Sequence, residues 1–158
     1  MRHIEGCTRD QSQLLPSRVD DYVYAENPVR FVDAFVDGLD LQGAGFTRVQ
    51  PKQTGRPSYD SNDLLRLYIY GYLNRVRSSR RLEAETHRNL AVIWLLRGLR
   101  PDFKTIADFR RDNRTAFKAV FRAFVLLCRK LDMKARLATQ PGILDRQREI
   151  VEHPSRPG

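Results

Sequence analysis

The chain has 158 residues, about the length of one domain. Its 41% of apolar and 30% of charged residues are an ordinary globular composition, which excludes a disordered chain over most of the length. The net charge of +9 is local: residues 75–130 carry fifteen Lys and Arg against five Asp and Glu, whereas residues 1–74 sum to −2 and residues 131–158 to +1. A positive field concentrated in this way is typical of nucleic-acid binders, although an arginine-rich proteome would also supply many of the 23 arginines.

Cys7 and Cys128 are the only cysteines in the sequence, and their separation argues against a disulfide framework and favours a reducing cytoplasm. The histidines have no Cys or His neighbours at ligand spacing, so no metal site and no cofactor are expected in this chain. The N-terminus lacks an apolar signal core, and the longest apolar run, Leu90 to Leu96, is too short to span a membrane. These features predict an intracellular protein.

The chain opens with a polar, aperiodic stretch, residues 1–26, which is expected to be an extended leader. Asn27 followed by Pro28 is a helix-start signal. Apolar residues at helical spacing then predict a first helix over residues 28–40. Glycines and prolines indicate that a loop follows this helix.

A second helix is expected over residues 60–76, with an acidic first turn and a broad apolar face. Gly71 within it indicates a close helix crossing. Ser78 or Ser79 then starts a short helix that ends near His87.

Three further helices are expected in the basic segment. Asn89 is a cap for a helix over residues 90–97, and Gly98 suits the left-handed position that ends it. Residues 105–112 form another short helix, and residues 115–131 a long amphipathic one.

No run of alternating β-branched residues is long enough for a strand, so the expected fold class is all-α. Residues 27–132 are expected to form a compact domain of five to seven helices. The apolar pattern fails after Met133, and residues 133–158 contain three prolines. This tail is therefore expected to be disordered or weakly helical.

The three short helices at 80–87, 90–97 and 105–112 are typical of a helix–turn–helix arrangement. The middle one is apolar on all sides and is expected to be buried. Residues 104–113 are the better reading helix, because Ile106, Phe109 and Asn113 share one face and leave the opposite face exposed. That exposed face contains Lys104, Ala107, Asp108 and Arg111. The alternative is a solvated helix face that binds nothing.

Four arginines surround the Ser78-Ser79 turn: Arg75, Arg77, Arg80 and Arg81. They would repel one another unless anions screen them, and DNA phosphates beside a helix N-terminus would do so. Glu83 and Glu85 offer the alternative of salt bridges within the protein.

The last helix has a basic stripe opposite an apolar side that is expected to be core. The stripe consists of Arg114, Lys118, Arg122 and Arg129. It is either an auxiliary contact with the DNA backbone or a solvated surface. The aromatic residues Trp94, Tyr68, Tyr70 and Tyr72 lie at helical spacing in apolar runs, so core packing is favoured over base stacking.

Enzyme signatures are missing from the sequence. It contains no glycine-rich phosphate loop, no Gly-x-Ser-x-Gly elbow and no His-Glu-x-x-His pair. Its acidic residues do not form a pattern suited to two-metal nucleotidyl transfer. No catalytic centre is expected.

Several fragments taken together closely resemble the N-terminal helical domain of bacterial insertion-sequence transposases with a DDE catalytic core. The similarity covers about residues 28–131. The fragments are Gly55-Arg56-Pro57, Tyr70-Gly71-Tyr72-Leu73, Arg80-x-Leu82-Glu83, residues 89–96 and Pro101-Asp102-Phe103-x-Thr105-Ile106-x-x-Phe109-Arg110.

The resemblance implies that the domain binds the terminal inverted repeats of a transposon and helps to assemble the synaptic complex. It also implies a following RNase H-like domain, whose three acidic residues hold two divalent metals for strand cleavage. That domain is expected to be absent from this chain, because Asp132 and Asp145 lack the setting of a catalytic aspartate. The change after Leu131 indicates a truncated or frameshifted copy, which is expected to be inactive by itself.

The expected partner is double-stranded DNA, with full-length transposase or a second copy of the chain as a further partner and no membrane. The alternative function is a helical interaction module that associates with full-length transposase and inhibits it, using the apolar residues 64–73 and 90–96. RNA binding is a third option. The expected DNA-contacting residues are Arg75, Arg77, Arg80, Arg81, Lys104, Thr105, Asp108, Arg110, Arg111, Arg114 and Lys118.

Overall fold

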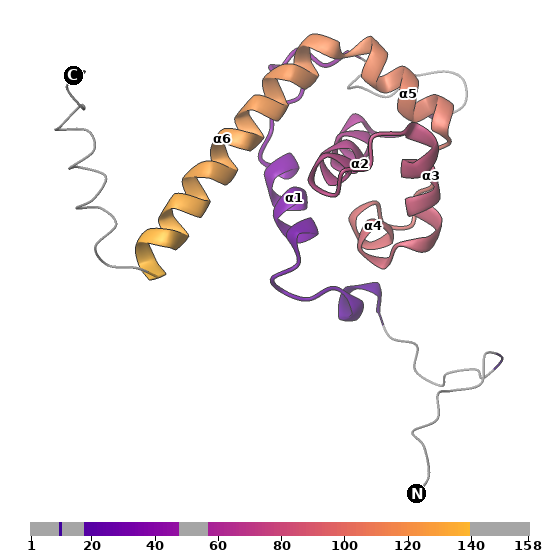
Figure 1. Cartoon of the computed structure of the whole chain (residues 1–158). Helices are drawn as coiled ribbons and strands as arrows, with labels where there is room; N and C mark the ends of the chain where they lie inside the picture. The colour runs from indigo at the N-terminus through magenta and orange to yellow at the C-terminus, as the bar shows by residue number, and fades with distance from the viewer. Residues whose placement is uncertain (1–9, 11–17, 48–56, 140–158) are drawn as a thin grey trace, which may run out of the picture. The chain divides into compact units, whose positions relative to one another are not determined.

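The computed structural model describes residue 10, residues 18–47 and residues 57–139, with side chains described up to residue 132. Within these ranges the chain is all-helical and contains no strand, which confirms the predicted fold class (Figure 1). A 3-10 turn, η1 (Val19–Tyr22), precedes six α-helices. The helices are α1 (Pro28–Asp37), α2 (Ser61–Leu73), α3 (Ser79–Arg88), α4 (Leu90–Leu95), α5 (Phe103–Asp112) and α6 (Arg114–Thr139).

The chain divides into two compact units. The first unit consists of Met1–Asp37 and Asn62–Ala107, and therefore holds η1, α1, α3, α4 and nearly all of α2. The second unit consists of Gly38–Ser61 and Asp108–Gly158, which includes α6. The boundary falls within α5, directly after Ala107.

Helix α2 is the buried centre of the first unit. Nearly every residue from Ser61 to Gly71 is buried. Leu65 and Ile69 on one face of the helix and Leu67 on the opposite face have no exposed surface at all. A helix that is apolar on a broad face is thus covered on all sides, as a central helix must be.

Gly71 lets α2 approach the turn that follows it. A Cβ atom at this position would lie 2.6 Å from the carbonyl oxygen of Val76 and 2.8 Å from Cδ2 of Leu82. The predicted close approach is therefore confirmed, and it involves both the α2–α3 turn and helix α3.

Replacing Gly71 by alanine is expected to lower the free energy of unfolding by about 1–3 kcal/mol, because the new Cβ overpacks against backbone. Helix propensity by itself predicts the opposite sign, a gain of about 1 kcal/mol for Gly→Ala inside a helix. Urea unfolding followed by far-UV circular dichroism measures the difference. A variant more stable than the wild type would contradict the close contact.

A buried arginine joins α1 to α2. The Arg66 side chain is 6% exposed and forms ion pairs with Asp33 at 2.9 Å, with Asp63 at 3.2 Å and with Asp37. Asp63 is itself buried and also pairs with Arg97 at 2.9 Å. The acidic face of α1, which by its spacing alone would face solvent, is therefore in part a contact surface for Arg66.

Part of the expected leader is structured. Residues 18–23 pass through η1, and Val23 is buried. The guanidinium of Arg30 donates to the Val23 carbonyl at 2.7 Å and to the Asp20 carboxylate at 2.9 Å, and lies 4.9 Å from the centre of the Trp94 ring. Trp94 donates its indole N–H to Asp20 at 2.8 Å. These two hydrogen bonds, first that of Trp94 and then that of Arg30, lower the pKa of Asp20.

Helix α4 is not buried on all sides, so that expectation is wrong. Val92, Leu95 and Leu96 are buried, but Leu90 is 50% exposed and Trp94 is only partly covered. The helix packs against η1, α1 and α3. These neighbours cover one side of it and leave the start of the helix open to solvent.

Several helix ends differ from the predicted ones. Helix α1 ends at Asp37 instead of residue 40, and α2 ends at Leu73 instead of residue 76. Helix α6 continues past Leu131 to Thr139 and so enters the expected tail. The rest of that tail, residues 140–158, lies outside the described residues. Nowhere in the described part of the chain is a helix both long and apolar enough to cross a membrane.

The second unit has an aromatic core. The rings of Phe46, Phe109 and Phe117 lie with their centroids 5.4–5.8 Å apart. Asn113, which separates α5 from α6, is buried; its side-chain oxygen accepts from the backbone N–H of Thr47 at 2.8 Å. This bond ties the loop before residue 48 to the break between the two helices.

Candidate nucleic-acid interface

Four exposed arginines lie at the α2–α3 turn: Arg75 and Arg77 are in the turn itself, and Arg80 and Arg81 are at the start of α3. Within the described part of the chain, Arg75, Arg77, Arg80 and Arg81 form no ion pair with an acidic side chain. The alternative of local salt bridges is therefore not realised among these residues. The turn thus presents four positive charges to solvent, and none of them has a counter-charge in the part of the chain that the structure describes.

Helix α2 ends in a Schellman motif with an arginine in the left-handed position. The backbone N–H of Val76 donates to Gly71 O at 2.8 Å, and that of Arg75 donates to Tyr72 O at 3.4 Å. Arg75 has a φ of +58°, in the region where glycine is the usual residue. This backbone conformation costs about 1 kcal/mol or more for a residue with a Cβ.

The end of α4 repeats the motif. Gly98 N donates to Ile93 O at 2.9 Å and Arg97 N to Trp94 O at 3.2 Å, so Arg97, with a φ of +53°, takes the left-handed position predicted for Gly98. Gly98 follows at φ +79°. The Arg97 side chain compensates for its strain by bonding both carboxylate oxygens of Asp63, at 2.9 and 3.0 Å. Among the described residues, Arg75 has no comparable bond.

Arg80 stacks on an aromatic ring. Its guanidinium lies 4.3 Å from the centre of the Phe103 ring at the start of α5, and Phe103 is 37% exposed. Such a cation–π contact is worth about 0.5–1 kcal/mol at an exposed site and holds the guanidinium in one orientation. Phe103 is absent from the predicted contact residues. Its pairing with Arg80, more than twenty positions earlier in the chain, gives no local sequence signal.

The predicted counter-charge Glu85 is occupied elsewhere. Its carboxylate accepts from Arg88 at 2.7 Å, from the Tyr70 hydroxyl at 2.9 Å and from the Asn89 amide at 2.9 Å. Burial by itself would raise the pKa of Glu85, but the hydrogen bonds from these three groups outweigh it and lower that pKa. Burial and the neighbouring carboxylate raise the pKa of Tyr70 to about 12. Tyr70 is therefore a neutral, fixed part of this network at neutral pH.

Helix α5 has the predicted two faces. Ile106, Phe109 and Asn113 are buried, whereas the opposite positions are exposed or half-buried. Those positions are Lys104, Ala107, Asp108 and Arg111, and Arg110 beside them is also exposed.

Two of the predicted DNA-contacting residues of α5, Arg111 and Thr105, already bond to groups within the protein. Arg111 pairs with Asp108 at 3.0 Å and with Asp112 at 3.2 Å. Thr105 donates both its backbone N–H and its hydroxyl to Asp102, at 2.8 and 3.1 Å. Thr105 thus belongs to the helix cap, and the first of these bonds is the main cause of the lowered pKa of Asp102.

Replacing Asp102 by alanine is expected to cost about 1 kcal/mol of stability at pH 7, the usual value for an N-cap. Because the folded-state pKa of Asp102 lies below its unfolded value, this contribution is present above pH about 4 and is lost as the pH falls through the folded pKa. Thermal unfolding of the wild type and of the Asp102→Ala variant from pH 7 to pH 2 measures how the difference in their stability changes with pH. Asp102→Asn, which caps without a charge, is the control and should keep most of the stability at every pH. A pH-independent loss in the alanine variant would argue against the charged cap.

The basic stripe of α6 is exposed as predicted. Arg114, Lys118, Arg122 and Arg129 face solvent, and Phe117, Val120 and Phe124 on the other side of the helix are buried. The tyrosines of α2 differ in their burial. Tyr68 and Tyr70 are buried as expected, whereas Tyr72 is 53% exposed, so the core assignment of Tyr72 is wrong. The tyrosines of α2 differ because its last turn extends beyond the buried part of the helix.

The family described as Transposase domain (DUF772) matches residues 17–112. This match covers more than half of the chain, and it includes η1, helices α1 to α5 and the turn with the four arginines. Neither a curated protein nor a solved structure matches the chain.

Proposed function

The chain belongs to the Transposase domain (DUF772) family, and from this membership we propose that it binds duplex DNA at the ends of a transposable element. The observation that carries the proposal is the α2–α3 turn, where four exposed arginines have no acidic partner among the described residues. DNA phosphates would supply the missing negative charge and would release their own counterions on binding. The turn residues Arg75, Arg77, Arg80 and Arg81 are therefore proposed as phosphate contacts.

Base recognition is proposed for helix α5. Its exposed side chains include Lys104, Arg110 and Arg111, and an arginine is the side chain best suited to a guanine edge. The ion pairs of Arg111 with Asp108 and Asp112 lie at the surface and are weak, so DNA can replace them. Arg114 and Lys118 of α6 are proposed as auxiliary phosphate contacts.

The experiment is binding to the terminal inverted repeat of the parent element and to an unrelated duplex of equal length, over a salt series. Phosphate contacts predict that the logarithm of the binding constant falls with the logarithm of salt concentration, with a slope of about −0.9 per contact. A flat salt dependence would exclude phosphate-driven binding. Arg111→Ala is expected to relax the preference for the terminal repeat, and an unchanged preference would mean that α5 is not the reading helix.

A second candidate function is association with full-length transposase. Three large apolar side chains at the surface of the first unit favour it: Tyr72, Leu73 and Leu90 are 40–53% exposed. Residues 64–71, which are most of the first of the two segments expected for this role, are instead buried in the core. Size-exclusion chromatography with and without full-length transposase tests the association.

RNA binding is tested separately. Duplex DNA and RNA compete for binding to the protein, and the better competitor identifies the preferred nucleic acid.

A further inference from the structure

An aromatic ring at the start of α5 lies against one of the arginines at the start of α3. Arg80 is the second residue of α3 and Phe103 is the first residue of α5, and both belong to the first unit. The guanidinium carbon of Arg80 lies over the Phe103 ring, 4.3 Å from its centre. Both residues are nevertheless exposed. The ring therefore holds the cation at a surface that a ligand can reach.

The ring holds Arg80 in a different way from the acids that hold two other arginines of the chain. Arg97 bonds both carboxylate oxygens of Asp63, and Arg111 pairs with Asp108. An acid fixes a guanidinium, but it also balances the positive charge and occupies N–H donors. The face of a phenylalanine ring attracts a cation although the ring carries no net charge. Arg80 is thus fixed while its charge stays available to an anion.

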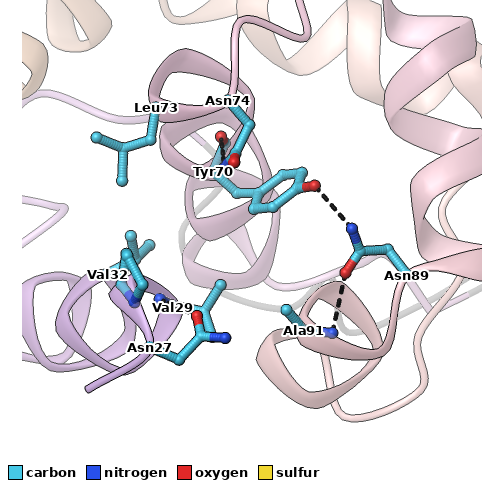
Figure 2. Close-up of a pocket in the computed structure, with 9 residues that line it drawn as sticks. Asn27, Val29, Val32, Tyr70, Leu73, Asn74, Asn89 and Ala91 are labelled. Atoms are coloured by element: carbon cyan, nitrogen blue, oxygen red, sulfur yellow. Dashed lines mark hydrogen bonds between the residues drawn. The ribbon is translucent and has the colours of Figure 1, made fainter. Parts of the chain in front are cut away.

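The acids of α3 do not compete for Arg80. The Glu85 carboxylate accepts from the Tyr70 hydroxyl and from the Asn89 amide, each at 2.9 Å, and Figure 2 shows the further hydrogen bond that joins Asn89 to Tyr70. In the part of the chain that the structure describes, Glu83 forms no ion pair, and the Arg80 side chain donates no hydrogen bond. The N–H donors of Arg80 therefore remain for a ligand.

We propose that Phe103 is a positioning residue for DNA binding, whose ring holds the Arg80 guanidinium ready for a DNA phosphate at the α2–α3 turn; this inference rests on the proposed function. An arginine side chain has many rotamers, and a ligand that immobilises it loses affinity by the entropy of ordering it. The contact with Phe103 orders Arg80 before the DNA arrives. Ordering one such side chain in advance is worth about 3- to 10-fold in the binding constant.

The first experiment replaces the ring. Phe103→Leu is expected to bind the terminal repeat and an unrelated duplex about 3- to 10-fold more weakly, by the same factor for both, because phosphate contacts carry no sequence information. The salt slope is expected to stay the same, since Arg80 keeps its charge. Phe103→Tyr keeps the ring and is expected to bind as the wild type does. Fluorescence anisotropy over a salt series measures affinity and slope.

A double-mutant cycle tests whether Phe103 acts through Arg80. In an Arg80→Ala background, Phe103→Leu is expected to cause no further loss of affinity. Arg81→Ala is the matched control, because Arg81 is also exposed and has no aromatic ring contact among the described residues. The losses from Arg81→Ala and Phe103→Leu are expected to multiply. If Phe103→Leu weakened binding equally with and without Arg80, Phe103 would act by another route and the proposal would be overturned.

A ring of unchanged shape separates positioning from packing. Trifluorophenylalanine at position 103 fills the same space as phenylalanine, but fluorine withdraws negative charge from the face of the ring and weakens the attraction for Arg80. It is expected to lower DNA affinity in the wild-type background and not in Arg80→Ala. Unchanged affinity in the fluorinated protein, or a loss in Phe103→Tyr equal to that in Phe103→Leu, would overturn the role of Phe103 and leave the proposed DNA binding intact. A failure of the wild type to bind any duplex would overturn both proposals.

Discussion

Replacement of Arg66 by methionine is expected to lower the free energy of unfolding by about 3–5 kcal/mol, the usual cost of removing one partner from a buried ion pair. Arg66 is 6% exposed and faces three carboxylates, those of Asp33, Asp37 and Asp63. Methionine fills much of the same volume but leaves Asp63, which is 5% exposed, with Arg97 as its remaining ion-pair partner among the residues described. Asp33 and Asp37 would then lose the charge that holds α1 against α2.

Chemical unfolding in urea, with circular dichroism as the readout, measures this loss. Because small domains are stable by only about 5–15 kcal/mol, a loss of this size takes away a large part of the total. Asp37→Asn is the control: the Asp37 side chain is 64% exposed, so its removal is expected to cost less than about 1 kcal/mol. If Arg66→Met cost no more than this control, the cluster would not hold the two helices together.

Simultaneous replacement of Arg77, Arg80 and Arg81 by alanine is expected to weaken DNA binding roughly 500-fold at 0.1 M salt and to make the salt slope shallower by about 2.7, if each arginine neutralises one phosphate. The loss should be the same for specific and unrelated duplexes, because phosphate contacts carry no sequence information. The three side chains are exposed, so the fold should persist. Fluorescence anisotropy over a salt series measures both quantities.

The control is the pair Arg18→Ala and Arg88→Ala. These arginines are also exposed, but each pairs with an acid, at 3.5 Å with Asp21 and at 2.7 Å with Glu85. Replacing them reduces the net charge but leaves the four arginines of the turn in place. Only a small loss of DNA affinity is therefore expected. An equal loss of affinity per charge removed in the two sets would mean that net charge, and not the turn, attracts the DNA.

Arg75→Gly separates binding from stability at the same turn. Glycine suits the left-handed backbone of Arg75, so the variant should be at least as stable as the wild type. Its DNA affinity should nevertheless fall about 8-fold at 0.1 M salt, because one phosphate contact is lost. Unchanged affinity would remove Arg75 from the proposed interface.

The helices were predictable because their signals are local. Asn27 and Asn89 cap α1 and α4 as predicted, and Ser78 is the N-cap position of α3. A helix is stabilised by bonds between residues four positions apart, so spacing and caps are enough to place it. The helix ends were less predictable. The left-handed residue that ends a helix is usually glycine, and here arginine takes that position twice.

Whether a charged side chain is buried, ion-paired or exposed could not be predicted from the sequence. In the sequence, Arg66 is one arginine among many, and its burial depends on two aspartates about thirty positions earlier. Arg111 and Arg80 look equivalent as candidate contacts, yet the first pairs with two aspartates and the second stacks on Phe103.

The sequence by itself determined that this protein is helical, that its positive charge lies in residues 75–130, and where most of its helices begin. Only the tertiary structure decided which arginines are buried, which are paired and which remain available to a ligand. The physical reason is the range of the interactions. Helix formation depends on neighbours within about one turn, whereas the cost of burying a charge or leaving it unpaired depends on what packs opposite to it from distant parts of the chain.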